Sequence, residues 1–292
     1  MKYSIKDLER LSGIKAHSLR IWEKRYKIFS PQRSLTNIRS YSDVDLRKLL
    51  NIAILNRNGL KISKIALMTS TVLEQEVIKL HKYSNDVESV IDRMTVTLLD
   101  LNELEFNRVI TDLLFDIDFE ELVMDYLFVF LERIGVLWQT GSISPAQEHF
   151  ISNIIRSKLI VAIEKIPVPV VYKSQKFLLF LREGELHEFG LLFINYLLRK
   201  YEFRTIYLGQ SVPYADILSI QKEHKADFLI TTIINQTGVE DSDITYFNRL
   251  NIDINHGRIL GIGKPFFSDI SKFKKVVFIE SYKTFREFIR EL

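Results

Sequence analysis

Residues 175–292 alternate short apolar runs with segments of helical spacing, and this alternation restricts the possible folds more than any other feature of the chain. The apolar runs are strand candidates at Lys176–Leu181, Thr205–Leu208, Phe228–Ile234, Ile259–Ile262 and Val276–Ile279. Helical patterns lie between them, for example at Leu191, Ile194, Leu197 and Leu198. Strands that alternate with helices predict a flavodoxin-like, doubly wound parallel sheet.

A sheet of this kind binds ligands beyond the carboxyl ends of its strands, at the switch point between the first and third strands. Glu185, His187 and Gly190 follow the first strand candidate, and Thr231 lies near the end of the third. The spacing lets the Glu185 carboxylate orient the His187 ring, while Gly190 permits close approach of the backbone, as at metal-bound histidines. His187 is therefore a candidate metal ligand.

Residues 75–166 contain four segments with apolar residues at helical spacing, at about 87–101, 103–116, 119–138 and 145–165. This pattern predicts a four-helix bundle with antiparallel neighbours. At one junction Trp138 ends a helix and Ser144 caps the next, which places Trp138, Glu148 and His149 near one end of the bundle. Taken alone, these residues indicate an interface tryptophan and a surface histidine, since a single histidine is rarely a metal ligand.

Charge is sorted along the chain. Residues 1–68 hold 15 Lys/Arg against 5 Asp/Glu, whereas residues 69–292 hold 25 against 32. A cationic head on an acidic body fits a DNA-binding module joined to a regulatory or assembly module, because phosphate neutralisation supplies much of the affinity for DNA. A solvated basic face is the alternative interpretation of the charge alone.

Composition excludes several classes of protein. The hydrophobic content of 47% excludes a disordered chain. The absence of cysteine excludes disulfides, thiolate nucleophiles and Cys-ligated metal centres. Because no apolar run is long enough to span a bilayer and the N-terminus lacks a signal-peptide pattern, we expect a cytoplasmic protein.

The cationic head has the pattern of a helix-turn-helix. Ser4 caps a short helix that Gly13 ends, and a second helix follows with basic residues on its exposed side. Two short helices around a glycine turn place the second helix to enter a major groove. The basic, aromatic segment 29–41 is interpreted as a wing that contacts phosphates. Ser42 then caps a third helix.

The head resembles the winged helix-turn-helix of MerR-type transcriptional regulators over residues 2–68. The resemblance rests on the run 19–26, on Pro31, Arg33, Asn37, Arg39, Tyr41 and Asp45, and on the run 59–65. It implies DNA contacts by His17 and Arg20 on the recognition helix, by Arg33, Arg39 and Tyr41 on the wing, and by Lys61 at a further backbone contact. Trp22 is expected in the core of the head.

The body resembles cobalamin-binding modules. Glu185, His187 and Gly190 are similar to their Asp/Glu-x-His-x-x-Gly motif, in which the histidine is the lower axial ligand of cobalt. Trp138 with Glu148 and His149 resembles their helical cap over the upper face of the corrin. The order of parts resembles the CarH/LitR group of cobalamin-dependent, light-responsive repressors, and implies domains at 1–74, 75–166 and 175–292.

Two motifs depart from that pattern. The Ser-x-Leu motif that lines the nucleotide-tail channel appears as Thr231-Thr232-Ile233, and the Gly-Gly pair appears as Ile262-Gly263. The resemblance thus implies cofactor contacts by Thr231 and Gly263. Ile262, however, adds a branched side chain where the backbone should approach the tail closely.

These observations lead to the expectation of a non-enzymatic repressor that binds an operator in double-stranded DNA as a homodimer or homotetramer. Adenosylcobalamin or methylcobalamin would control its assembly. If the cofactor is adenosylcobalamin, light would control the assembly as well. One alternative is a regulator with a degenerate, cofactor-free sensor that responds to a protein partner. Another is a corrinoid-dependent enzyme or methyl carrier, against which the DNA-binding head argues.

Overall fold

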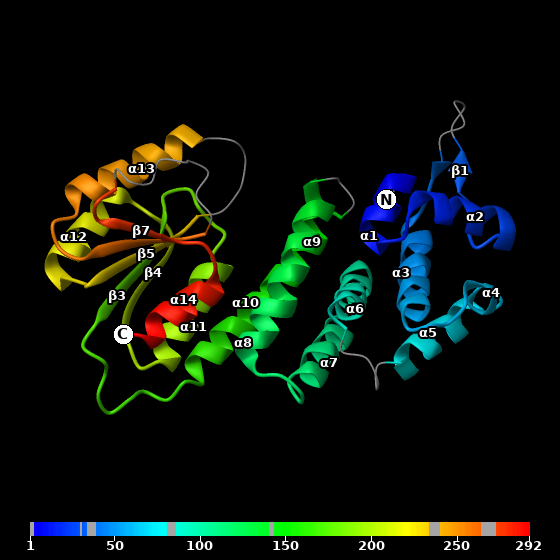
Figure 1. Ribbon diagram of the computed structural model, residues 1–292, viewed down its shortest axis with the longest axis horizontal. Helices are drawn as coiled ribbons and strands as arrows, with labels where there is room; N and C mark the ends of the chain where they lie inside the picture. The colour runs from blue at the N-terminus through cyan, green and yellow to red at the C-terminus, as the bar shows by residue number, and fades with distance from the viewer. Residues whose placement is uncertain are drawn as a thin grey trace. The chain divides into compact units, whose positions relative to one another are not determined.

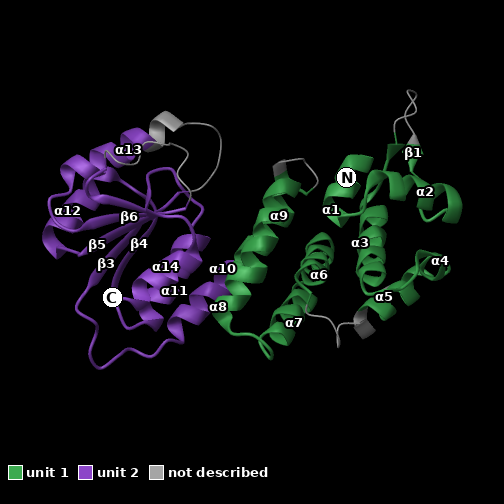
Figure 2. Cartoon of the chain, viewed as in Figure 1, with its two compact units in different colours: residues 1–155 green, residues 156–292 purple. Residues whose placement is uncertain are grey.

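The computed structural model describes residues 3–29, 31–33, 39–80, 86–139, 143–233, 240–263 and 273–292 (Figure 1). The chain divides into two compact units, residues 1–155 and 156–292, each described by itself below (Figure 2). The boundary falls inside helix α10 (Pro145–Glu164). The first unit holds the head together with most of the bundle, and the expected division at 74 and 166 stays a prediction.

The head begins with two short helices. Helix α1 (Ile5–Ser12) starts with the expected capping box, in which Asp7 N donates to Ser4 Oγ at 3.2 Å and Ser4 N donates to Asp7 Oδ2 at 2.8 Å. Gly13 ends α1 in the left-handed conformation at φ 70°, which only glycine adopts without strain. Helix α2 (Ala16–Tyr26) follows. The sequence-based prediction of these helices is confirmed.

A wing and three helices complete the head. Strands β1 (Gln32–Arg33) and β2 (Arg39–Ser40) pair antiparallel. Helix α3 (Asp43–Arg57) is capped by Ser42, and α4 (Ile62–Ile65) and α5 (Ser70–Leu80) follow. The core of the head is mainly aliphatic and also includes Tyr3, Phe29 and Tyr41, whereas Trp22 is only half-buried, contrary to the expectation. Its fully buried side chains include Leu8, Leu11, Leu19, Leu46 and Leu49.

The bundle helices agree with the four predicted segments. They are α6 (Val87–Leu99), α7 (Glu103–Leu113), the run α8 (Phe119–Glu121), η1 (Leu122–Leu127) and α9 (Phe128–Gln139), and α10. In the third segment η1 is a π-helical insert within one continuous run. Helix α3 of the head packs on α6 of the bundle, which explains why the two belong to one unit.

A buried ion network joins head and bundle inside the first unit. Asp92 on α6 is fully buried, and its two carboxylate oxygens accept from Arg133 Nη1 at 2.5 Å and Arg57 Nη1 at 2.7 Å. Arg57 Nη2 also donates to Ser12 O at 2.6 Å, at the end of α1. Arg133 Nη2 donates to Glu88 at 2.7 Å. One carboxylate therefore ties α3, α6 and α9 together.

The stability of the protein should depend on pH through Asp92. Burial raises the pKa of Asp92 to about 6, although Arg57 and Arg133 both lower it. Because this pKa exceeds the ordinary value of about 3.9, the folded protein takes up the proton before the unfolded chain does. The stabilisation of the folded protein by this bound proton is fully present below about pH 4 and is lost as pH rises through about 6.

Urea unfolding of wild type and Asp92→Asn across this pH range tests the linkage, because asparagine cannot titrate. We expect the free energy of unfolding of wild type, relative to Asp92→Asn, to fall as pH rises from about 4 to about 6. A difference that is constant over this range would contradict the assignment.

The second unit is the predicted flavodoxin-like sheet. Its strands are β3 (Lys176–Arg182), β4 (Arg204–Val212), β5 (Phe228–Thr232), β6 (Arg258–Ile262) and β7 (Val276–Ile279). All pair in parallel, in the order β4-β3-β5-β6-β7. This order places the switch point between β3 and β5, as expected.

Helices cover both faces of the sheet. Figure 1 shows α12 (Tyr214–His224) and α13 (Glu240–Asp253) on one face and α11 (Phe189–Lys200) and α14 (Tyr282–Arg290) on the other. Strand β3 is buried on both faces, which explains its continuous apolar run. Within the described ranges no helix is both long and apolar enough to cross a bilayer.

Candidate functional site

Helix α2 presents a basic surface. His17 and Arg20 are exposed, as are Lys24 and Arg25 one turn further on, whereas Leu19 is buried in the head. Lys61, which precedes α4, is also exposed. The side chain of Arg33 lies outside the described residues, although its backbone forms β1. These positions are compatible with the DNA contacts implied by the MerR resemblance.

Glu23 fixes the wing to α2. Both of its carboxylate oxygens accept from Arg39 Nε at 3.1 Å, and its Oε2 accepts from the Tyr41 hydroxyl at 3.1 Å. Tyr41 is 2% exposed, and burial raises its pKa to about 12. The burial favours a packing role for Tyr41 rather than direct DNA contact. Sequence reasoning missed Glu23, although it lies in the motif run 19–26.

The three candidate cap residues lie at adjoining ends of α9 and α10. Trp138 is 53% exposed, although its neighbour Leu137 is fully buried. Glu148 Oε2 pairs with His149 Nδ1 at 2.8 Å, and Glu148 Oε1 accepts from Ser152 Oγ at 2.6 Å. Ser144 and Gln147 form the predicted capping box of α10. A large aromatic ring and a carboxylate-held imidazole thus remain available on the surface of the first unit.

In the second unit, Glu185 holds His187 at the switch point. Glu185 Oε1 lies 2.5 Å from His187 Nδ1 and accepts from His187 N at 2.9 Å. The hydrogen bond from His187 lowers the pKa of Glu185, which therefore stays ionised. The loop is tied to β4, because Ser211 N donates to Glu185 O at 3.1 Å and Gln210 Nε2 donates to Leu186 O at 3.1 Å.

This geometry fits a single axial ligand to a metal. With Nδ1 on the Glu185 carboxylate, Nε2 is the ring nitrogen that would bind a metal, and His187 is half-exposed. The described residues hold no cluster of three or more His, Asp or Glu suited to bind a metal by themselves. A lone histidine suits a metal whose other ligands come from its own macrocycle.

The structure adds a second anchor beside His187 that the sequence did not suggest. Glu188 is 5% exposed, forms an ion pair with Arg156 and accepts from the Tyr207 hydroxyl at 3.2 Å. Burial together with Glu188 raises the pKa of Tyr207. Glu188 thereby fixes the start of α11 to the C-terminal half of α10 and to β4, all within the second unit.

The remaining candidate residues line the carboxyl ends of β5 and β6. Thr231 is 3% exposed and Ile262 is 2% exposed, and both belong to strands in register with each other. Gly263 has φ 127°, and Gly190 lies buried near the start of α11. The structure thus brings Glu185, His187, Gly190, Thr231 and Gly263 to one edge of the sheet in the second unit.

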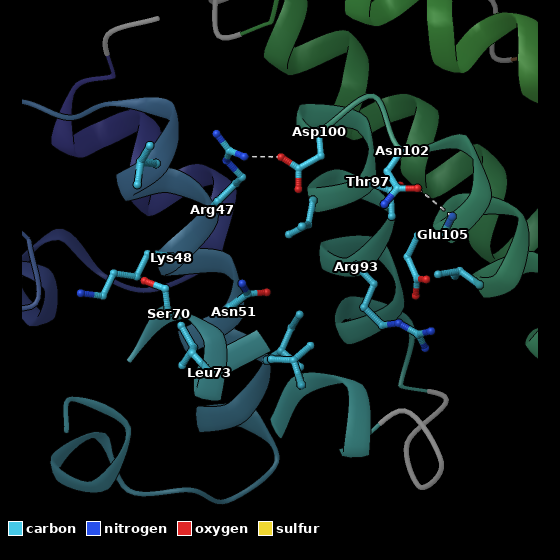
Figure 3. A pocket seen from close by; sticks show the side chains of 15 residues that line it. Arg47, Lys48, Asn51, Ser70, Leu73, Arg93, Thr97, Asp100, Asn102 and Glu105 are labelled. Carbon is cyan, nitrogen blue, oxygen red and sulfur yellow. Dashed lines mark hydrogen bonds and ion pairs between the residues drawn. The ribbon is translucent and has the colours of Figure 1, made fainter. Parts of the chain in front are cut away.

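The first unit contains a cavity of about 370 Å³ between the head and the bundle, which the sequence did not predict. Arg47 on α3 and Asp100 after α6 point toward one another across it and form an ion pair (Figure 3). Lys48, Arg93 and Glu105 also line it. Because the lining carries charges of both signs, it does not define one class of ligand.

Comparisons with known proteins agree with the description of the head and of the helical bundle. Residues 3–71 match the MerR HTH family regulatory protein model, and residues 90–162 match the B12 binding domain model. The HTH-type transcriptional repressor CarH of Myxococcus xanthus is 24% identical over 271 residues, covering 89% of this chain and 88% of that protein. The repressor CarA of the same organism is 25% identical over 244 residues, with coverage of 82% and 80%.

Among solved structures, the monomethylamine corrinoid protein of Methanosarcina barkeri matches with a TM-score of 0.54 at 15% identity, over 71% of this chain and 100% of that chain. This likeness concerns the fold alone. The chain therefore holds a head that matches the MerR HTH model and a helical region that matches the B12 binding domain model. Over most of its length the chain is similar to these two transcriptional repressors.

Proposed function

We propose that this chain is a DNA-binding transcriptional repressor that responds to cobalamin. The observation that carries the proposal is the order of its parts: a MerR-type head, a B12-binding helical domain, and a sheet with a carboxylate-oriented histidine at its switch point. Two transcriptional repressors align with this chain over 88% and 80% of their length. The same relatives favour a regulator over a corrinoid enzyme and over a cofactor-free sensor.

DNA recognition is assigned to α2 and the wing. His17 and Arg20 would reach the major groove, while Arg33, Arg39 and Lys61 would contact phosphates. Glu23 would position the wing by holding Arg39 and Tyr41. Two-fold symmetric sites are typical of dimeric helix-turn-helix proteins, which supports a homodimer or a homotetramer.

Cofactor binding is assigned to His187, with Trp138, Glu148 and His149 on the cap. Bound cobalamin would supply a cobalt ion and, with an adenosyl group on the cobalt, a light-sensitive cobalt–carbon bond. Glu185 holds the Nδ1 proton of His187, which fixes the ring orientation and raises the basicity of Nε2. Regulation then requires only that the two assembly states bind the ligand with different affinities.

A gel-shift experiment tests the proposed function. The DNA is a duplex selected by the full-length protein from a random library, and affinity is measured without cofactor, with adenosylcobalamin in the dark, and after illumination. We expect adenosylcobalamin to change the affinity and illumination to reverse the change. An affinity that is identical in all three conditions would contradict cobalamin control.

Arg20→Ala should weaken binding to the selected duplex. A base-reading arginine contributes about 1–3 kcal/mol, which corresponds to a loss of about 5- to 150-fold. Arg108→Ala is the matched control, because Arg108 is 64% exposed on the bundle and far along the chain from the head. An Arg20→Ala affinity equal to that of Arg108→Ala would remove Arg20 from the DNA interface.

A further inference from the structure

We propose that this protein holds its corrinoid through His187 while the nucleotide tail stays outside the fold, because its own side chains and backbone fill the space around Gly190, Thr231 and Gly263. The inference rests on the proposed function and adds which part of the ligand is recognised. It follows from three separate places at the carboxyl edge of the sheet, each of which is closed.

The first closed place is beside Gly190. A Cβ atom built there would lie 2.0 Å from the hydroxyl oxygen of Tyr282 and 3.0 Å from its Cζ. The ring of Tyr282, at the start of α14, therefore lies directly against the Gly190 backbone. It also packs edge-on against Phe193, with ring centroids 5.9 Å apart. Tyr282 is partly buried, and this burial raises its pKa to about 12. The room that this glycine provides is already occupied.

The second closed place is at Thr231-Thr232-Ile233. The cavity beside these residues, which Tyr246 and Phe247 close from α13, measures only about 10 Å³. That volume holds about one water molecule and no part of a nucleotide base. Thr232 Oγ1 and the Tyr246 hydroxyl are both buried and lack hydrogen-bond partners among the described residues. Phe247 is 3% exposed and packs on Phe278, with ring centroids 5.1 Å apart.

The third closed place is at Gly263. A Cβ atom there would lie 2.5 Å from Ile233 O, so the glycine serves a close contact between two segments of the chain itself. Ile233 N donates to Ile262 O at 2.8 Å, and Gly263 N donates to Ile279 O at 2.9 Å. Gly261 behaves similarly, because its Cβ would lie 2.9 Å from Phe278 Cδ1. These backbones approach one another rather than a ligand.

The position of His187 does not depend on the residues that fill these three places. Its side chain is 49% exposed, and its orientation comes from Glu185 and the β4 loop. A corrin ring can therefore meet His187 from solvent without displacing Tyr282, Tyr246 or Phe247. Affinity then comes from the axial bond and the ring, and the nucleotide contributes nothing favourable. A corrinoid without the nucleotide base should bind at least as tightly, since no base has to leave the cobalt first.

Titrations of the full-length protein with adenosylcobinamide and adenosylcobalamin, in the dark and followed by visible spectra, test this inference. We expect cobinamide to bind at least as tightly as cobalamin. Cobalamin binding tighter by about tenfold or more would overturn the inference and leave the proposed function standing. Binding of neither corrinoid would overturn the proposed function and this inference with it.

Two further measurements do not depend on that comparison. The phosphorus NMR line of bound cobalamin should stay narrow, because a tail in solvent moves independently, whereas a broad line would overturn the inference. Tyr282→Ala should shift the preference toward cobalamin by opening the space beside Gly190, and Tyr282→Phe, which keeps the ring, should not. Equal preferences in these two variants, with circular dichroism confirming that both are folded, would remove Tyr282 as the residue that excludes the tail.

Discussion

Asp92→Ala should lower the free energy of unfolding by about 3 kcal/mol, near the lower end of the range for breaking a buried ion pair by removing one partner. The substitution leaves two arginines that face the emptied site, Arg57 and Arg133, with side chains 28% and 17% exposed. Their partial exposure lets water compensate some of the loss, which is why we place the effect near the lower end. Urea unfolding of the full-length protein at pH 7 measures it.

Glu88→Ala is the matched control, because Glu88 pairs with Arg133 in the same network but its side chain is 55% exposed. An exposed pair contributes at most about 1 kcal/mol, so this variant should stay close to wild type. If the free energy of unfolding fell by the same small amount in both variants, Asp92 would not be the residue that joins α3, α6 and α9.

The sheet could be predicted because apolar runs and helical spacing are local signals. The predicted strands begin within one residue of the observed ones, and the switch point follows from their order. The second strand was predicted too short. Strand β4 continues to Val212 through irregular pairing at Gly209, where glycine and polar residues indicate a turn in the sequence.

The contacts that decide the roles of individual residues are not local, and the sequence could not supply them. Arg39 and Tyr41 carry the types expected on a DNA-binding wing, but both meet Glu23, which lies 16 and 18 residues earlier. Asp92 meets arginines 35 and 41 residues away. Composition and spacing do not reveal which side chains of a basic segment bond to an acidic residue far away in the sequence.

The candidate cofactor site likewise contains one contact that the sequence could predict and others that it could not. The Glu185–His187 pair is separated by one residue, so its geometry could be inferred from the motif, and the hydrogen bond is present. Ile262 was the suspected obstacle to the nucleotide tail. The structure instead points to Tyr282, Tyr246 and Phe247, which reach the edge of the sheet from α14 and α13. These residues lie far from the motifs in sequence and carry no signal of their own.

His187→Ala should abolish cobalamin binding, because the axial nitrogen is the one protein atom assigned to the metal. Glu185→Gln should weaken binding by about 10- to 100-fold, since loss of a carboxylate that orients a metal-bound histidine has this effect. The glutamine cannot accept the Nδ1 proton as an ionised carboxylate does, and the lowered pKa of Glu185 keeps that carboxylate charged in wild type. Visible spectra of the protein titrated with adenosylcobalamin in the dark measure both effects.

Glu183→Gln provides the control, because Glu183 is exposed in the same loop and should leave affinity unchanged. We expect the loss of affinity to be largest in His187→Ala, smaller in Glu185→Gln and absent in Glu183→Gln. A general effect of negative charge would instead give the two glutamine variants the same loss. Retention of wild-type affinity by His187→Ala would show that His187 is not the cobalt ligand.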